Sequence, residues 1–121
     1  MDFLLYILIL LYSVILHEIA HGYAAYRNGD NTAYREGRLT LNPISHIDII
    51  GSIIVPTITY FSFGFPFGWA KPVPYNVDIV GRNKYGELQV SSAGVLMNYF
   101  FVFFAVVSYH LFSHFGFMNQ E

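Results

Sequence analysis

Charged residues are unevenly distributed along this chain and leave three long uncharged stretches. No Asp, Glu, Lys or Arg occurs within residues 3–17, 49–70 or 88–120. Hydrophobic residues make up 55% of the chain and charged residues only 12%, about half the share that is usual in soluble proteins. A soluble domain of this size buries only about 65% of its surface, which is too little to cover so much apolar area. The sequence therefore predicts an integral membrane protein in contact with the lipid bilayer.

The remaining composition excludes several other classes of protein. Six Lys and Arg against eight Asp and Glu give a net charge of −2, so the chain has no basic surface for nucleic acid. Cysteine is absent, which excludes disulfide scaffolds, cysteine-based zinc sites and thiol nucleophiles. A length of 121 residues corresponds to at most one domain, residues 1–121.

The first and third uncharged stretches predict long helices that cross the membrane. A helix over residues 2–27 would be about 38 Å long, which is enough to span a bilayer. Gly29 and Asp30 are typical of the end of such a helix. Residues 93–117 are uncharged and rich in Phe and Val, so we expect a second full span there.

The middle stretch is apolar over residues 47–67 but is interrupted by glycine and proline. We interpret it as a re-entrant segment, with a full span as the alternative. Residues 34–41 alternate partly as in a short strand, and the prolines in residues 68–76 favour an extended backbone. The expected fold class is therefore an all-α membrane protein with two long transmembrane helices, this middle segment and a small extended or β insertion.

The basic residues predict the orientation in the membrane. All six lie between Arg27 and Lys84. If the middle segment is re-entrant, they share one side, which the positive-inside rule makes cytoplasmic, with both termini outside. A full middle span would place three basic residues on each side of the membrane, and the rule would then predict no orientation. The asymmetry favours the re-entrant arrangement in a multi-pass protein of the cell membrane.

The first predicted helix contains an H-E-x-x-H motif formed by His17, Glu18 and His21. Residues four apart share a helix face, so the two imidazoles can bind one metal ion while Glu18 accepts a proton from water. Ionisable residues inside a membrane helix are costly and usually mark function. Counted from Arg27, the histidines lie ~9–15 Å inside the cytoplasmic boundary. We predict a metal site within the bilayer that opens toward the cytoplasm.

Other polar residues are candidates with structural alternatives. Asn98 lies about 8 Å into the third run, where its amide can bind substrate or an oxyanion, or can link two helices. The small residues 91–94 before it let another helix approach closely. Asp48 is either a further metal ligand or a cap of the middle segment. His110 and His114 repeat the four-residue spacing, either as interfacial histidines or as a separate metal or haem pair.

Together these motifs resemble the site-2 protease family of intramembrane zinc metalloproteases, over about residues 8–98. The resemblance rests on H-E-x-x-H-G at residues 17–22 and G-D-x-x-A at residues 29–33. It continues with G-R-L-T-L-N-P-x-x-H-I-D-x-x-G at residues 37–51. The remaining matching motifs are G-W-A-K-P-V-P at residues 68–74 and A-G-x-x-x-N at residues 93–98.

The resemblance implies that His17 and His21 bind Zn²⁺ and that Glu18 is the general base. It implies hydrolysis of a peptide bond in or near a transmembrane segment of another protein, held in extended form by strand addition. The family takes its third zinc ligand from an Asp in a later Leu-Asp-Gly motif, which this sequence does not contain. We therefore expect the chain to be the N-terminal part of such a protease, or a truncated product, that binds zinc weakly until a C-terminal segment supplies this ligand.

Two other functions remain open at this point. A non-catalytic relative that binds membrane segments without cutting them would have no need of Glu18. A metal or haem carrier would use both histidine pairs, His17 with His21 and His110 with His114. Metal content and an absorption spectrum distinguish such a carrier from a protease.

Overall fold

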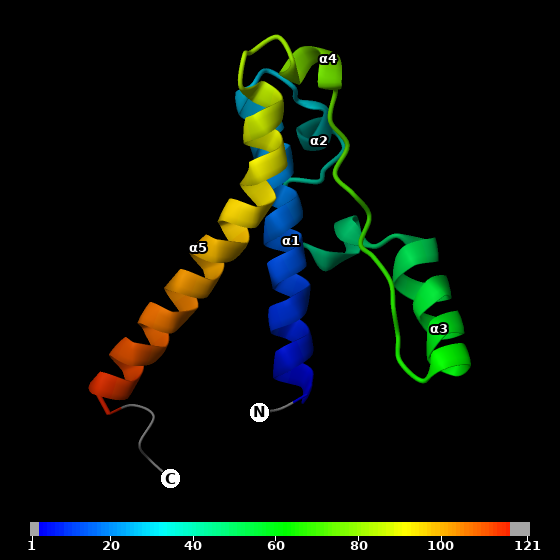
Figure 1. The fold of residues 1–121 in the computed structure, drawn as a ribbon, viewed down its shortest axis with the longest axis vertical. Coiled ribbons are helices and arrows are strands. Elements are labelled where there is room, and N and C mark those ends of the chain that lie inside the picture. The colour runs from blue at the N-terminus through cyan, green and yellow to red at the C-terminus, as the bar shows by residue number, and fades with distance from the viewer. Residues whose placement is uncertain (1–2, 117–121) are drawn as a thin grey trace.

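Two long helices form an antiparallel pair in the computed structural model, which describes residues 3–116 (Figure 1). Helix α1 spans Phe3–Arg27 and helix α5 spans Gly86–His114. By length and composition, Ile7–Arg27 and the whole of α5 are apolar enough to cross a membrane. Both predicted long helices are thus confirmed as helices. Helix α5 begins before the predicted start at residue 93 and ends at His114, short of the predicted end at residue 117. The predicted start of α1 at Asp2 lies outside the described residues.

Helix α1 ends where the sequence signal predicts. Gly29 adopts a left-handed backbone with φ of 90°, which only glycine adopts without strain. The N–H of Asp30 then donates to the carbonyl of Ala25 at 3.0 Å, and the N–H of Gly29 donates to the carbonyl of Tyr26 at 3.0 Å. These bonds satisfy carbonyls at the end of the helix and turn the chain away from it.

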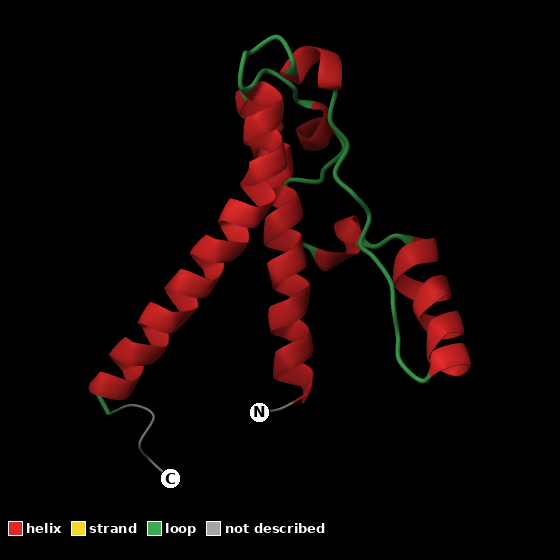
Figure 2. Ribbon diagram, viewed as in Figure 1, coloured by secondary structure: helices red, strands yellow, loops and turns green. Residues whose placement is uncertain are grey.

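The middle apolar segment runs outward as a helix and returns as an extended chain (Figure 2). A π-helical turn, Ile49–Ile54, leads into α3, Val55–Phe63, and this apolar helix is shorter than a membrane span. The returning chain bonds back to it, because the N–H of Trp69 donates to the carbonyl of Gly51 at 2.9 Å. The hydroxyl of Ser52 also donates to the carbonyl of Trp69 at 2.9 Å. The segment therefore folds back along its own helix, and its re-entrant placement in a membrane stays a prediction.

The short strand predicted for residues 34–41 is wrong. The chain forms a single helical turn there, α2 at Thr32–Arg35, and the described residues contain no strand. Gly37, with φ of 69°, ends the turn as the N–H of Arg38 donates to the carbonyl of Ala33 at 3.0 Å. The alternation does not separate a buried face from an exposed one, because the charged Arg38 is buried and the apolar Leu41 is 57% exposed, while Leu39 packs at Gly22 of α1. Alternation without a partner strand does not make a sheet.

A small cluster of buried apolar side chains lies where the ends of α1 and α5 meet α4, Val77–Val80. It is formed by Ala25, Val80 and Val90, with Ala24 packed against them, and other apolar residues such as Ile15 and Val73 are buried outside it. By contrast, much of the apolar surface of α5 is exposed, including Phe103 at 67%. Exposed apolar surface on this scale indicates contact with lipid or with another protein.

Asp30 joins the end of α1 to the segment that precedes α4. Its side chain is 1% exposed, and its carboxylate accepts hydrogen bonds from the N–H and hydroxyl of Thr32 and from the N–H of Asn76. Burial raises the pKa of Asp30, but these hydrogen bonds and the charge of Arg35 outweigh it, so that the pKa lies below its ordinary value. Asp30 is therefore ionised and bonded in the folded chain.

We expect acid to destabilise the fold through Asp30. Because the folded-state pKa lies below the ordinary value of 3.8, the carboxylate stabilises the fold above that pH, and the contribution is lost as the pH falls through the folded pKa. Thermal unfolding in detergent from pH 7 to pH 3 measures this loss. Asp30→Asn should cost about 1–3 kcal/mol at pH 7 and show a smaller acid-induced decrease. If the melting temperature of the wild type and of Asp30→Asn fell equally in acid, the stabilising role of ionised Asp30 would be contradicted. Asp78→Asn, at an exposed carboxylate, is the control.

Candidate metal centre

The two histidines of the H-E-x-x-H motif converge on one face of α1. Their Nε2 atoms are 3.0 Å apart, and the two rings meet edge to face with centroids 4.6 Å apart. Two nitrogen ligands of a tetrahedral zinc ion at ~2.05 Å from the metal would be separated by about 3.3 Å. The pair therefore lies close to the separation that one zinc ion requires.

Helix α5 orients both imidazoles from their outer nitrogens. His21 Nδ1 lies 2.6 Å from the carbonyl oxygen of Val90, and because a carbonyl only accepts, Nδ1 donates and Nε2 keeps its lone pair. Nδ2 of Asn98 donates to Nδ1 of His17 at 3.0 Å, so in the neutral imidazole of His17 the proton is on Nε2, facing Nε2 of His21. Oδ1 of Asn98 accepts from the hydroxyl of Ser13 at 3.4 Å. The Val90 carbonyl is the kind of acceptor that orients a metal-binding histidine. For His17 to bind a metal through Nε2, its proton has to be on Nδ1 and the Asn98 amide has to turn its Oδ1 toward that N–H.

The helix-linking alternative for Asn98 is therefore the one that the structure shows. Its amide bridges Ser13 and His17 of α1 from its position on α5. The expected depth is also confirmed, since Asn98 lies beside the motif rather than at the opposite end of the helices. A role of this amide toward substrate or an oxyanion stays a prediction.

Gly94 is the point at which α5 comes closest to the histidines. A Cβ atom at this position would lie 2.5 Å from Nε2 of His21 and 2.6 Å from Nε2 of His17, distances that real Cβ atoms do not tolerate. Glycine is therefore required for the two helices to approach this closely. The close approach expected for residues 91–94 is confirmed, and it occurs at the Nε2 atoms of the two histidines.

Glu18 lies on the other side of the pair, against the extended segment. Its Oε2 accepts a hydrogen bond from the N–H of Val73 at 3.1 Å. Glu18 and His21 line one cavity of about 270 Å³, together with Pro72, Val73, Tyr75, Val90 and Ser91. The carboxylate and an imidazole thus face a common space that can hold water.

The other predicted candidates lie elsewhere. Among residues 3–116, no third His, Cys, Asp or Glu joins the histidine pair in a group that could hold a metal ion. Asp48 accepts from the N–H of Ile50 and from the indole N–H of Trp69, each at 3.0 Å, so the capping alternative is confirmed. His110 and His114 lie near the end of α5, with their rings against Tyr109 and Phe115 respectively; whether they bind metal stays untested.

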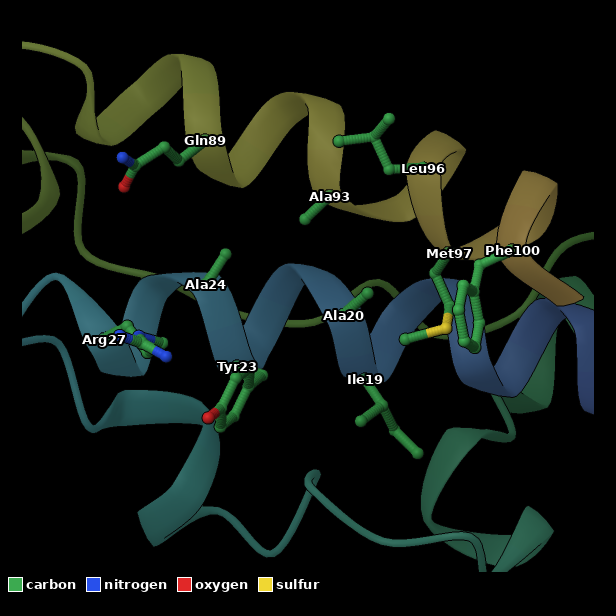
Figure 3. A pocket seen from close by; sticks show the side chains of 10 residues that line it. All are labelled: Ile19, Ala20, Tyr23, Ala24, Arg27, Gln89, Ala93, Leu96, Met97 and Phe100. Atoms are coloured by element: carbon green, nitrogen blue, oxygen red, sulfur yellow. The ribbon is translucent and has the colours of Figure 1, made fainter.

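A second cavity between α1 and α5, of about 580 Å³, lies outside this site (Figure 3). Small side chains such as Ala20 and Ala93 line it, together with larger apolar ones such as Met97 and Phe100. Neither the histidines nor Glu18 line this cavity. We assign it no part in the chemistry of the site.

Sequence reasoning missed three groups that contact the motif or its neighbours. Ser13 is the only Ser or Thr in the first apolar run, and a lone hydroxyl there is a sequence signal for a polar contact between helices. The backbone N–H of Val73 carries no sequence signal, because every residue except proline has one. Arg38 is 2% exposed, and its burial follows from the tertiary fold alone.

Comparison with known proteins relates the chain to a metalloprotease. The chain is 39% identical over 107 residues to a Bacillus subtilis (strain 168) protein named "Putative zinc metalloprotease YwhC". The match covers 86% of this chain and 46% of the relative, so the chain spans less than half of the relative's length. No family model and no solved structure matches the chain. The identity supports a metalloprotease-type relationship.

We expect the 121-residue chain to bind zinc weakly through His17 and His21, because two imidazoles leave the ion under-coordinated. Equilibrium dialysis in detergent followed by metal analysis measures the binding. His17→Ala should abolish it, whereas the control His110→Ala should leave it unchanged. Gly94→Val should also weaken it, since the added side chain occupies the space of the imidazole nitrogens. Tight one-to-one binding would contradict the two-ligand description.

Proposed function

We propose that the chain carries the histidine pair and general base of an intramembrane zinc metalloprotease of the site-2 protease type. The observation that carries the proposal is the convergence of His17 and His21, with Nε2 atoms 3.0 Å apart, beside Glu18 on a helix apolar enough to cross a membrane. The relationship to a zinc metalloprotease agrees with it. In this proposal residues 1–121 form one domain of a multi-pass protein of the cell membrane, with the site facing the cytoplasm.

The donor set fits zinc. Imidazole nitrogen is a preferred zinc ligand, and the outer nitrogen of His21 donates to the Val90 carbonyl as such a ligand requires. The outer nitrogen of His17 faces the Asn98 amide, whose oxygen turns to accept from it in this proposal. When bound, zinc supplies a Lewis acid that lowers the pKa of water toward about 7. Because catalytic sites usually have three protein ligands, we propose that a further segment with a Leu-Asp-Gly motif supplies the third.

Glu18 is the residue that moves the proton in this proposal. With Oε2 held by the N–H of Val73, Oε1 accepts a proton from the water that attacks the scissile carbonyl. The carboxyl group then donates that proton to the nitrogen of the leaving amine as the peptide bond breaks. One water is consumed, and Glu18 returns to its ionised form.

The substrate is proposed to be a transmembrane segment of another protein. A cavity of about 560 Å³ lies between α1 and the middle segment, and most of its lining is apolar, including Val14, Ile53 and Trp69. It follows α1 on the N-terminal side of the motif and can take apolar side chains. A helical substrate hides its carbonyl groups in its own hydrogen bonds, so the substrate must unwind before it reaches Glu18.

The extended segment limits how a substrate strand can pair with it. The N–H groups of Trp69, Lys71 and Val73 already donate to Gly51, His46 and Glu18. Pro72 and Pro74, on either side of Val73, have no N–H to donate. A substrate strand here would therefore have to supply the N–H donors itself, using carbonyl groups of this segment as acceptors.

Cleavage of single-span substrates in proteoliposomes tests the proposal. The chain alone should not cleave them, because misplaced reacting groups cost ~100-fold or more in rate. Adding a C-terminal segment with a Leu-Asp-Gly motif should restore cleavage. Glu18→Gln should remove the restored activity by at least ~100-fold while zinc content stays unchanged, since the proton acceptor is lost and the ligands remain.

Two results would count against this account. Cleavage that survives Glu18→Gln would exclude Glu18 as the general base. Strong Glu18-dependent cleavage by the 121-residue chain alone would show that no further segment is needed for the third ligand. Glu87→Gln, at an exposed carboxylate in the first turn of α5, is the matched control and should leave activity unchanged.

A further inference from the structure

Arg38 is a charged side chain that the fold buries close to the proposed site. It is 2% exposed, and its Nη2 and Nη1 donate to the carbonyls of Lys71 at 2.6 Å and Pro72 at 3.1 Å. Both partners are neutral backbone groups, and within the described chain its Nε has no hydrogen-bond partner. Burying a charge is costly, and two carbonyl groups compensate for it only in part. This arrangement therefore needs an explanation beyond packing.

One peptide group connects Arg38 to Glu18. The carbonyl of the Pro72–Val73 peptide accepts from Arg38, and the N–H of the same peptide donates to Oε2 of Glu18 at 3.1 Å. In a planar trans peptide these two groups point in opposite directions. Arg38 and Glu18 thus bind the two edges of one rigid unit. A cation on the carbonyl also polarises the peptide and strengthens its N–H as a donor.

The surroundings keep this peptide in place. Prolines on both sides of Val73 restrict the backbone, and the N–H of Lys71 donates to the carbonyl of His46 at 2.9 Å. The side chain of Val73 is 8% exposed and packs at Gly22, where a Cβ atom would lie 3.1 Å from Val73 Cγ1. Gly22 is one helical turn after Glu18, so the peptide and the carboxylate are held against the same face of α1.

We propose that Arg38 is a positioning residue for Glu18. By holding the Pro72–Val73 peptide, it keeps the Val73 N–H on Oε2 and leaves Oε1 of Glu18 directed to the water beside the histidine pair. The inference rests on the proposed function only for the role of Glu18 as general base. The link from Arg38 through the peptide to Glu18 is a property of the fold and is testable without activity.

NMR of the 121-residue chain labelled with ¹⁵N-valine in detergent micelles tests the link. The Val73 amide signal is identified as the one missing in Val73→Ile. Glu18→Gln should move this amide proton upfield, because a neutral acceptor forms a weaker hydrogen bond than a carboxylate. Arg38→Met should move it in the same direction and raise its hydrogen-exchange rate at least ~10-fold. Arg38→Lys should retain part of the protection.

The controls separate positioning from general stability. Arg82→Met removes an exposed Arg and should leave the Val73 signal unchanged. In Arg38→Met, the amides of Val90 and Val102 on α5 should keep their wild-type shifts. An unchanged Val73 signal in Arg38→Met overturns the link. A shift of all valine amides together also overturns it, since that pattern shows loss of the fold rather than release of one peptide.

The cleavage assay, with the Leu-Asp-Gly segment present, tests the consequence for Glu18. Arg38→Met should lower kcat by ~10- to 100-fold and leave KM within about twofold, and Arg38→Lys should restore part of the rate. An unchanged kcat overturns the positioning role. If no protein cleaves substrate while the Val73 signal still responds to Arg38→Met, the proposed function fails and the link from Arg38 to Glu18 stands.

Discussion

The contact between Gly94 on α5 and the imidazoles of His17 and His21 on α1 is the constraint on which the rest of the arrangement depends. Because residue 94 has no side chain, the two helices meet at the Nε2 atoms of the two imidazoles. One helical turn away on either side of Gly94, the Val90 carbonyl and the Asn98 amide reach the outer nitrogens of the two rings. The two histidines are four residues apart on α1, and each faces a partner that is four residues from Gly94 on α5. One antiparallel crossing of the two helices therefore orients both rings.

Glu18 belongs to a second set of contacts, made on the side of α1 that faces the middle segment. The extended chain over residues 69–76 is bonded at several points, to the turn before α3, to Arg38 and to Asp30. The Val73 N–H reaches Glu18 only because these anchors hold the chain against α1. The metal-binding pair and the proposed base are therefore positioned by different parts of the molecule, which meet along one helix.

The long helices, the motif within the first of them and the end of α1 at Gly29 could all be predicted, because each depends on local composition and spacing. The close approach at residues 91–94 and the depth of Asn98 were also predicted correctly, from small residues and helical rise. The strand at residues 34–41 was not, because the partial alternation there does not match burial in the fold, where Arg38 is buried and Leu41 is exposed. Hydropathy alone left the middle segment undecided between a re-entrant segment and a full span. The structure adds that its apolar helix is shorter than a span and that the returning chain bonds back to it.

By itself, the sequence determined which residues share a helix face, since helical geometry places residues four apart on the same side. It thereby determined that His17 and His21 can act on one ion and that Glu18 is beside them. Only the tertiary structure decided that Asn98 meets His17, that the peptide after Pro72 meets Glu18, and that Arg38 is buried behind that peptide. These contacts join segments far apart in the chain, and their geometry depends on how closely the helices pack and on where each turn ends, which no local spacing specifies.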